Sequence, residues 1–159
     1  MSLGPTAWAD LGCGDGTFTR ALAEVLASRS IVHAIDRDAR ALADIPTHHN
    51  DVQIETYLGD FTEFPWPVDN LDGVLMANSL HYVKNQAAFI ASCGSQMKPA
   101  HGFLIVEYDT DRSNVWVPYP IGRRALATLF EAAGYATITI LGSRPSVYQR
   151  APLYAAMVS

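Results

Sequence analysis

The sequence predicts one α/β domain, built on a doubly wound and mostly parallel sheet that closes with an antiparallel pair of strands. Apolar runs of strand length alternate with segments of helical period along most of the chain, which is typical of a parallel sheet covered on both faces. The stretch "LGCGDG" follows the first apolar run directly. The last two strand-like runs have no helix between them, which allows an antiparallel pair and disfavours a parallel crossover.

The first half of the chain alternates buried strands with short helices. Phe18, Leu22 and Val25 recur at helical spacing directly behind the glycines. Pro46 ends the second helix, and the proline-rich segment 61–70 is a poor helix former. The predicted strands are 6–12, 30–36, 52–60 and 71–79, and the predicted helices are 18–26 and 38–45.

The second half contributes two helices and three strands. Pro99 stops one predicted helix, and Gly134 closes the other near its end. We expect helices at 85–98 and 123–135, and strands at 102–109, 136–142 and 152–158. A length of 159 residues without a repeat or linker fits one domain over residues 1–159, in which Met1–Leu3 have no structural role.

Charge and cysteine content restrict the functional classes. The net charge of −5 argues against a protein that grips nucleic-acid phosphates non-specifically, so we expect no nucleic-acid partner. Cys13 and Cys93 are too few for a disulfide framework, which favours a reducing, cytoplasmic setting. No apolar stretch approaches the ~20 residues of a membrane span, and the first residues lack a signal-peptide pattern. We therefore expect no membrane contact.

Polar residues or glycines lie at the carboxyl ends of four of the predicted strands. They are Asp10 and Gly12 at the end of the first strand, Asp36 at the end of the second, Asp60 at the end of the third and Asn78 at the end of the fourth. The carboxyl ends of parallel strands meet at one edge of the sheet, where open α/β sheets bind their ligands. The sequence therefore predicts a ligand site at this edge.

The residue types at this edge suit a nucleoside. Gly12, Gly14 and Gly16 can adopt backbone angles closed to other residues and let a ligand approach the helix amino terminus. Asp36 can accept two hydrogen bonds from ribose hydroxyls and lies about twenty residues past the glycines, where nucleotide-binding folds place that acid. Asp60 can accept from an exocyclic amine such as that of adenine.

With these motifs the chain resembles the class I methyltransferases that use S-adenosyl-L-methionine. The resemblance covers nearly the whole chain in the family's order, through "ADLGCGDG", "AIDRD", "GDFTEFPWP", "LDGVLMANSLHYV" and "MKPAHGFLIVEY". It implies a Rossmann-like sheet of seven strands in the order 3-2-1-4-5-7-6. It also implies methyl transfer to a small organic acceptor by in-line displacement at the sulfonium methyl, with no metal.

The resemblance assigns cofactor contacts to the strand ends. Asp10 is expected to bind the cofactor's amino group directly or through water, and Asp36 to hold the ribose. Asp60 and the backbone of Phe61 are expected to read the adenine edge, with Arg37 beside the ring. The predicted cofactor-binding residues are Asp10, Gly12, Cys13, Gly14, Gly16, Asp36, Arg37, Asp60, Phe61, Asn78 and Leu80.

His81 is the candidate catalytic residue. It follows the fourth strand near the expected acceptor, and the ordinary pKa of imidazole suits a general base for an acceptor that arrives protonated. The alternative is a structural histidine, because transfer from a sulfonium can rely on positioning and exclusion of water alone. Tyr82, Tyr108 and Asp109 are further pocket candidates.

The sequence motifs that bear on the methyl acceptor are less specific than those for the cofactor. "NSLHYV" lacks the "NPPY" signature of amino-group methylases and is closer to the "N.LHH" pattern of small-molecule enzymes. The loop Thr110–Pro120 contains Arg112, Trp116 and Tyr119. These residues either bind an anionic or planar acceptor or are solvent-exposed residues without a binding role. We expect a small organic molecule.

Members of the family usually carry helices before the glycine motif that roof the cofactor, whereas here the first strand begins almost at once. We therefore expect an open site, or a cover from a second copy, a partner chain or an upstream segment. Two other functions stay open. One is a non-catalytic methyltransferase-like binding module, and the other is an NAD(P)-dependent oxidoreductase, whose GxGxxG spacing differs from the spacing here.

Overall fold

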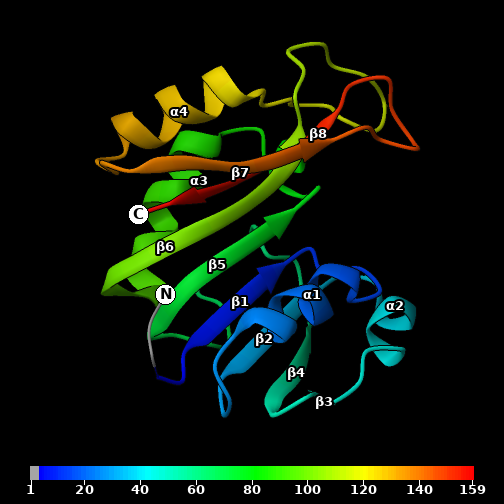
Figure 1. Cartoon of the computed structure of the whole chain (residues 1–159), viewed down its shortest axis with the longest axis vertical. Helices are drawn as coiled ribbons and strands as arrows, with labels where there is room; N and C mark the ends of the chain where they lie inside the picture. Colours follow the sequence, from blue (N-terminus) through cyan, green and yellow to red (C-terminus); the bar gives the residue numbers. More distant parts are fainter. Residues whose placement is uncertain (1–3) are drawn as a thin grey trace.

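One twisted sheet of eight strands runs through residues 4–159, the part of the chain that the computed structural model describes (Figure 1). Residues 1–3, which we assigned no structural role, lie outside it. The spatial order of the strands is β3-β4-β2-β1-β5-β6-β8-β7. Their bounds are β1 Ala7–Leu11, β2 Ile31–Asp36, β3 His48–His49, β4 Val52–Leu58, β5 Leu71–Ala77, β6 Met97–Tyr108, β7 Ile138–Arg144 and β8 Leu153–Val158.

Helices cover both faces of the sheet. The helices are α1 (Thr17–Val25), α2 (Ala39–Ala43), α3 (Gln86–Cys93) and α4 (Arg123–Ala132), with short 3₁₀ turns η1 (Leu80–Tyr82) and η2 (Gly94–Gln96). The first two pack on β2 and its neighbours, whereas α3 and α4 pack on the opposite face against side chains of β5, β6 and β8. In Figure 1, α3 lies behind β6 and α4 lies next to β7. No helix within residues 4–159 is long and apolar enough to cross a membrane.

The predicted fold class is confirmed. Strand β1 pairs in parallel with β2 and β5, and β4 and β6 extend the sheet in parallel on either side. Strand β8 pairs antiparallel with β6 on one side and with β7 on the other. The seven predicted strands stand in the order that the resemblance implied. Strand β8 runs antiparallel to both of its neighbours, because the connection before it has no helix.

The predicted count of seven strands is wrong by one. The additional strand is β3, two residues that pair antiparallel with the start of β4 at the edge of the sheet. Asn50 turns the chain between them with a positive φ of 51°. A two-residue strand is too short to show an alternating pattern, so only the pairing across this turn reveals it.

The predicted boundary between the third helix and the fifth strand is also wrong. The helix 85–98 ends at Cys93, and β6 already begins at Met97 and passes through Pro99. Met97 pairs with Leu71, and the register then shifts so that Gly73 pairs with Gly102. Pro99 lies inside this irregular stretch, where a residue without an N–H withdraws no hydrogen bond from the regular ladder.

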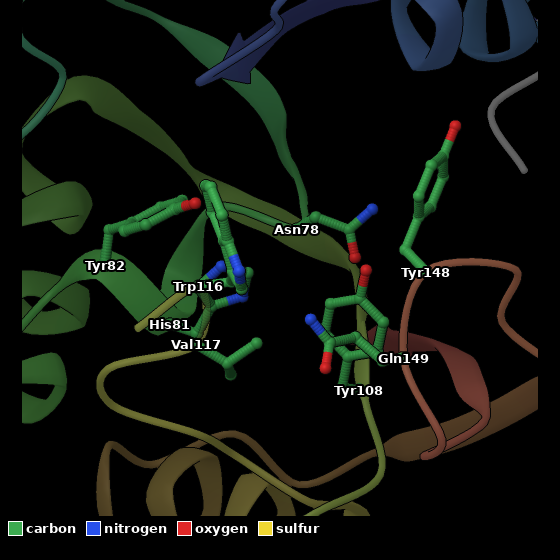
Figure 2. A pocket seen from close by; sticks show the side chains of 8 residues that line it. All are labelled: Asn78, His81, Tyr82, Tyr108, Trp116, Val117, Tyr148 and Gln149. Atoms are coloured by element: carbon green, nitrogen blue, oxygen red, sulfur yellow. The ribbon is translucent and has the colours of Figure 1, made fainter. Parts of the chain in front are cut away.

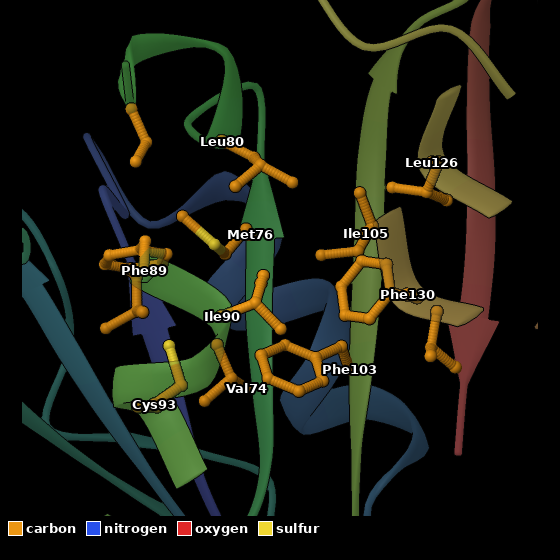
Figure 3. Packing of buried hydrophobic residues seen from close by; sticks show 14 of the residues in the cluster. Val74, Met76, Leu80, Phe89, Ile90, Cys93, Phe103, Ile105, Leu126 and Phe130 are labelled. Atoms are coloured by element: carbon orange, nitrogen blue, oxygen red, sulfur yellow. The ribbon is translucent and has the colours of Figure 1, made fainter. Parts of the chain in front are cut away.

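The main core lies between the sheet and the helices α3 and α4 (Figure 3). The ring centroid of Phe103 lies 5.1 Å from that of Phe130 and 5.5 Å from that of Tyr135. Side chains of β5 and β6 point into the same cluster as those of α3 and α4, among them Val74, Met76, Ile105, Phe89, Ile90 and Leu126. This packing holds the ends of β5 and β6 in place, and both ends carry site residues.

Candidate cofactor and acceptor site

A cavity of about 420 Å³ opens at the carboxyl ends of the central strands, and we call it the cofactor cavity. It lies where β1 pairs with β2 on one side and β5 on the other, the point at which open α/β sheets bind ligands. Its lining residues are Gly12, Asp36, Arg37, Gly59, Asp60, Phe61, Thr62, Asn78, Ser79 and Tyr82. Six of the predicted residues are therefore brought together, while Gly59, Thr62, Ser79 and Tyr82 were not predicted as cofactor contacts.

The glycine loop after β1 is shaped by backbone geometry. Gly12, Gly14 and Gly16 all have positive φ, at 74°, 55° and 77°. The N–H of Gly12 donates to the carbonyl of Ile35 at 2.9 Å, which pins the loop to β2. A Cβ on Gly12 would lie 2.8 Å from the Cβ of Ser79, closer than real contacts allow. A side chain at this position would therefore both strain the backbone and fill the wall of the cavity.

Asp36 joins the glycine loop to the segment that begins α2. Its Oδ2 accepts from the N–H of Gly14 at 2.8 Å, and its Oδ1 accepts from the N–H of Asp38 at 2.9 Å. The side chain is half-buried and lines the cofactor cavity. Because a carboxylate has about four acceptor positions, these two bonds leave capacity for two ribose hydroxyls.

Asp60, which follows β4, lines the same cavity. Its Oδ1 accepts from the hydroxyl of Thr62 at 2.7 Å and from the N–H of Thr62 at 2.9 Å. These hydrogen bonds, the hydroxyl first, hold the pKa of Asp60 below its usual value. The carboxylate is therefore ionised at neutral pH and can accept from an amine.

Asn78 and Ser79 carry buried polar atoms that lack partners. Among residues 4–159, nothing hydrogen-bonds to the Oδ1 of Asn78 or the Oγ of Ser79. Asn78 adopts a left-handed φ of 55°, and its N–H donates to the carbonyl of Val106 at 2.8 Å. An unsatisfied buried polar group costs about 1–3 kcal/mol, so two of them in one cavity wall suit a polar ligand. The cavity thus fits a cofactor with a nucleoside and an amino-acid part.

A second cavity of about 390 Å³ adjoins the first, and we call it the acceptor cavity. Asn78 and Tyr82 line both cavities. Figure 2 shows Tyr82, His81 and Trp116 on one side, Tyr108, Gln149 and Tyr148 on the other, and Asn78 between them. Val117 completes the lining. A molecule in this cavity would therefore lie next to one in the cofactor cavity.

His81 and Glu107 form a buried pair at the wall of the acceptor cavity. The Nδ1 of His81 lies 2.7 Å from the Oε2 of Glu107, and the backbone N–H of His81 donates to the Oε1 at 3.1 Å. Both side chains are at most 2% exposed. A carboxylate only accepts, so the pairing places a proton on Nδ1 and leaves Nε2 of the neutral ring as an acceptor. Glu107 was not predicted as a site residue.

A family described as a methyltransferase domain matches residues 9–100, more than half of the chain. The chain belongs to this methyltransferase domain family. The match confirms the predicted class I S-adenosylmethionine-dependent family. A probable S-adenosylmethionine-dependent methyltransferase of Mycolicibacterium smegmatis is 24% identical over 141 residues, which are 84% of this chain and 53% of that protein. The chain thus spans about half the length of this curated relative.

Solved methyltransferase structures share the fold of this methyltransferase domain. The DhpI complex with S-adenosylhomocysteine superposes with a TM-score of 0.69 at 22% identity, over 95% of this chain and 75% of that one. The 1,6-didemethyltoxoflavin-N1-methyltransferase of Burkholderia thailandensis superposes with a TM-score of 0.72 at 19% identity, over 97% of this chain and 70% of that one.

Asp10 lies behind the glycine loop of the methyltransferase domain and does not line either cavity. Its carboxyl group is fully buried, and its Oδ2 accepts from the hydroxyl of Thr19 at 2.6 Å. Its Oδ1 has no partner among residues 4–159. Burial raises the pKa of Asp10 to about 7, with a smaller contribution from the negative charge of Asp36. Its contact with the cofactor's amino group stays a prediction.

Four other predicted residues also lie outside the lining of the cofactor cavity. Leu80 is fully buried in the core, and Cys13 is buried beside α1 and α2. Burial raises the pKa of the Cys13 thiol far above its usual value, which fits a packing residue. Gly14 and Gly16 shape the loop through their backbone angles. Direct cofactor contacts from these four residues stay predictions.

The loop between β6 and α4 places only some of its candidates in the acceptor cavity. Trp116 lines it, whereas Arg112 and Tyr119 do not. Asp109 instead pairs with Arg123 at 2.6 Å, and it also accepts from the backbone N–H of that residue at the start of α4. Tyr148 and Gln149, which were not predicted, come from the loop before β8. The only feature of the sequence that could have indicated them is an aromatic residue in a loop bounded by two prolines.

Proposed function

We propose that this methyltransferase domain transfers a methyl group from S-adenosyl-L-methionine to a small organic acceptor by in-line displacement. The observation that carries the proposal is the junction of the two cavities, because Asn78 and Tyr82 line both. An acceptor atom at this junction would face a methyl group held in the cofactor cavity. Holding the two reactants in this geometry supplies much of the rate of such a transfer.

The residues of the cofactor cavity fit the parts of the proposed cofactor. Asp36 has acceptor capacity for the ribose hydroxyls, and the ionised Asp60 can accept from the adenine amine. The unpartnered Oδ1 of Asn78 and Oγ of Ser79 suit the polar amino-acid end. When bound, the cofactor supplies a methyl group on positively charged sulfur, which needs no metal activation.

His81 is proposed to act as the general base. Its Nε2 is left as the acceptor by the bond from Nδ1 to Glu107, so it can take the proton that an acceptor N–H or O–H releases. The negative charge of Glu107 then stabilises the imidazolium, because both side chains are buried and in direct contact. The structural alternative is that Glu107 only anchors η1 through the backbone N–H of His81.

A labelled-methyl experiment tests the proposed function. Calorimetry first measures the binding of S-adenosylmethionine, S-adenosylhomocysteine and the nicotinamide dinucleotides. We expect the first two to bind and the dinucleotides not to bind, because the spacing of the loop glycines differs from the GxGxxG of dinucleotide sites, and this loop together with Asp60 suits an adenosine joined to an amino acid. Transfer of radiolabelled methyl to pools of small molecules is then measured.

The outcomes separate the three candidate functions. Label transfer to a small molecule supports the proposal. Cofactor binding without transfer to any pool favours the non-catalytic binding module. Tight dinucleotide binding without a response to S-adenosylmethionine would contradict the assignment and favour an oxidoreductase.

A further inference from the structure

The acceptor cavity has aromatic walls on several sides. Tyr82 comes from η1, Tyr108 from the end of β6, and Trp116 and Tyr148 from two separate loops. The side chains of Trp116 and Tyr148 are 71% and 85% exposed. Large aromatic side chains that line one cavity and remain open to solvent are typical of a surface that buries them against a ligand.

The ring of His81 is part of this aromatic enclosure. Its centroid lies 4.4 Å from that of Tyr82 and 6.1 Å from that of Tyr108. A flat molecule that stacks on these walls can therefore bring its own edge to Nε2. A bulky saturated molecule of equal volume would lose the ring contacts, because only a flat face meets several aromatic faces at once.

The polar groups of the acceptor cavity carry no fixed charge. The lining contains Asn78 and Gln149 but no lysine, arginine, aspartate or glutamate. Arg112 does not line the cavity, and Arg123 is paired with Asp109. An anionic acceptor would lose its hydration without gaining a positive partner, which is costly.

The buried charge behind His81 acts in the same direction. Glu107 is fully buried and directly contacts the imidazole, so its negative charge lies close to this wall of the cavity. It repels a carboxylate or phosphate in the cavity, and it favours a group that gives up a proton to His81. Of the two acceptor types that the sequence left open, anionic and planar, the structure favours the planar one.

We propose that the acceptor is an uncharged, planar aromatic or heteroaromatic molecule that stacks on Trp116 and the tyrosines and directs an N–H or O–H to His81. This inference rests on the proposed function. The acceptor nitrogen or oxygen forms the new bond to the methyl carbon, and the carbon–sulfur bond breaks with its electron pair remaining on sulfur. The acceptor's proton moves to the Nε2 of His81.

Four matched probes test this acceptor class on the chain saturated with S-adenosylhomocysteine. They are 2-naphthol, 2-methoxynaphthalene without the O–H, 6-hydroxy-2-naphthoate with an added charge, and decahydro-2-naphthol without planarity. Titration followed by ligand-observed NMR gives the four dissociation constants. We expect the two neutral aromatic probes to bind about tenfold or more tightly than the naphthoate and the saturated alcohol.

A second readout tests the direction of the O–H. In protein labelled with ¹⁵N-histidine, 2-naphthol should shift the Nε2 resonance of His81, and 2-methoxynaphthalene should shift it much less. A naphthoate or saturated alcohol that binds as tightly as 2-naphthol overturns the proposed acceptor class. Equal shifts of Nε2 by both neutral aromatic probes overturn the contact with His81.

Variants of the loops locate the binding. Trp116→Ala and Tyr148→Ala should each weaken 2-naphthol about tenfold, while Val147→Ala, which removes an 89% exposed neighbour outside the lining, should not. Unchanged binding in the first two variants overturns the proposal. Calorimetry with S-adenosylhomocysteine separates the two levels of inference. If S-adenosylhomocysteine binds but the probes contradict the planar acceptor, only the acceptor class is wrong and the proposed function stands. If S-adenosylhomocysteine does not bind, the proposed function itself is wrong.

Discussion

Replacement of Asp36 by alanine tests the cofactor cavity most directly. The carboxylate lines the cavity and already accepts from the N–H groups of Gly14 and Asp38, at 2.8 and 2.9 Å. Asp36→Ala therefore removes the expected acceptor of the ribose hydroxyls and also loosens the link between the glycine loop and the start of α2. Both effects should weaken cofactor binding.

The magnitude follows from the number of hydrogen bonds. Loss of two charge-assisted bonds to the ribose costs about 2–4 kcal/mol, which corresponds to a roughly thirty- to thousandfold higher dissociation constant. The cost to folding should be smaller, about 1 kcal/mol or less, because Asp36 is half-buried and water can replace it at the two N–H groups. The fold should therefore remain intact.

Calorimetric titration with S-adenosylhomocysteine measures the change, and thermal denaturation checks the fold. Asp44→Ala is the matched control, because it removes an equal charge from an exposed position at the end of α2. Asp36→Asn keeps one acceptor oxygen and should fall between the wild type and Asp36→Ala. An unchanged dissociation constant in Asp36→Ala would show that the ribose binds elsewhere. An equal loss in Asp44→Ala would indicate a general effect of charge.

Three further predictions concern His81, Asp10 and the cover of the site. In Glu107→Gln, the new amide N–H can donate to the Nδ1 of His81, so the imidazole proton moves to Nε2 and the ring can no longer act as the base. ¹⁵N-histidine NMR should show this switch of tautomer, and the rate of methyl transfer should fall about a hundredfold or more. An unchanged tautomer in this variant contradicts the assigned role of Glu107. Burial raises the pKa of Asp10 from 3.8 to about 7, so between these pH values the folded chain holds a proton that the unfolded chain has released, and the free energy of unfolding falls as pH rises. The free energy of unfolding of Asp10→Asn should rise relative to that of the wild type as the pH rises from 4 to 7, and the difference should persist above pH 7. A difference between the two proteins that does not change with pH would refute this prediction. Finally, with both cavities open to solvent, the isolated chain should bind S-adenosylmethionine with micromolar affinity, about −8 kcal/mol, whereas transfer should be weak and should rise with protein concentration if a second copy supplies the cover. Fast transfer that is independent of concentration would show that the loop Thr110–Pro120 closes the site by itself.

Much of the cofactor cavity could be predicted because its residues follow strands. Alternating strands and helices bring the carboxyl ends of parallel strands to one edge, so Gly12, Asp36, Asp60 and Asn78 meet there whatever the details of packing. Ser79 was missed because its role depends on a buried oxygen without a partner. Burial is a property of the packed fold and has no local pattern.

The sequence by itself thus determined the fold class and the edge of the sheet that carries the site, because hydrophobic periodicity and glycine spacing act over a few neighbouring residues. Its resemblance to the methyltransferase family implied the strand order. Only the tertiary structure decided the rest. It placed Glu107 against His81, 26 residues earlier in the chain, and brought Tyr148 to the same cavity as Trp116. It also buried Asp10, which the resemblance had assigned to the cofactor's amino group, behind the glycine loop. A cavity wall is formed by contacts between segments distant in the sequence, and the energies of those contacts depend on the distances and burial that folding creates.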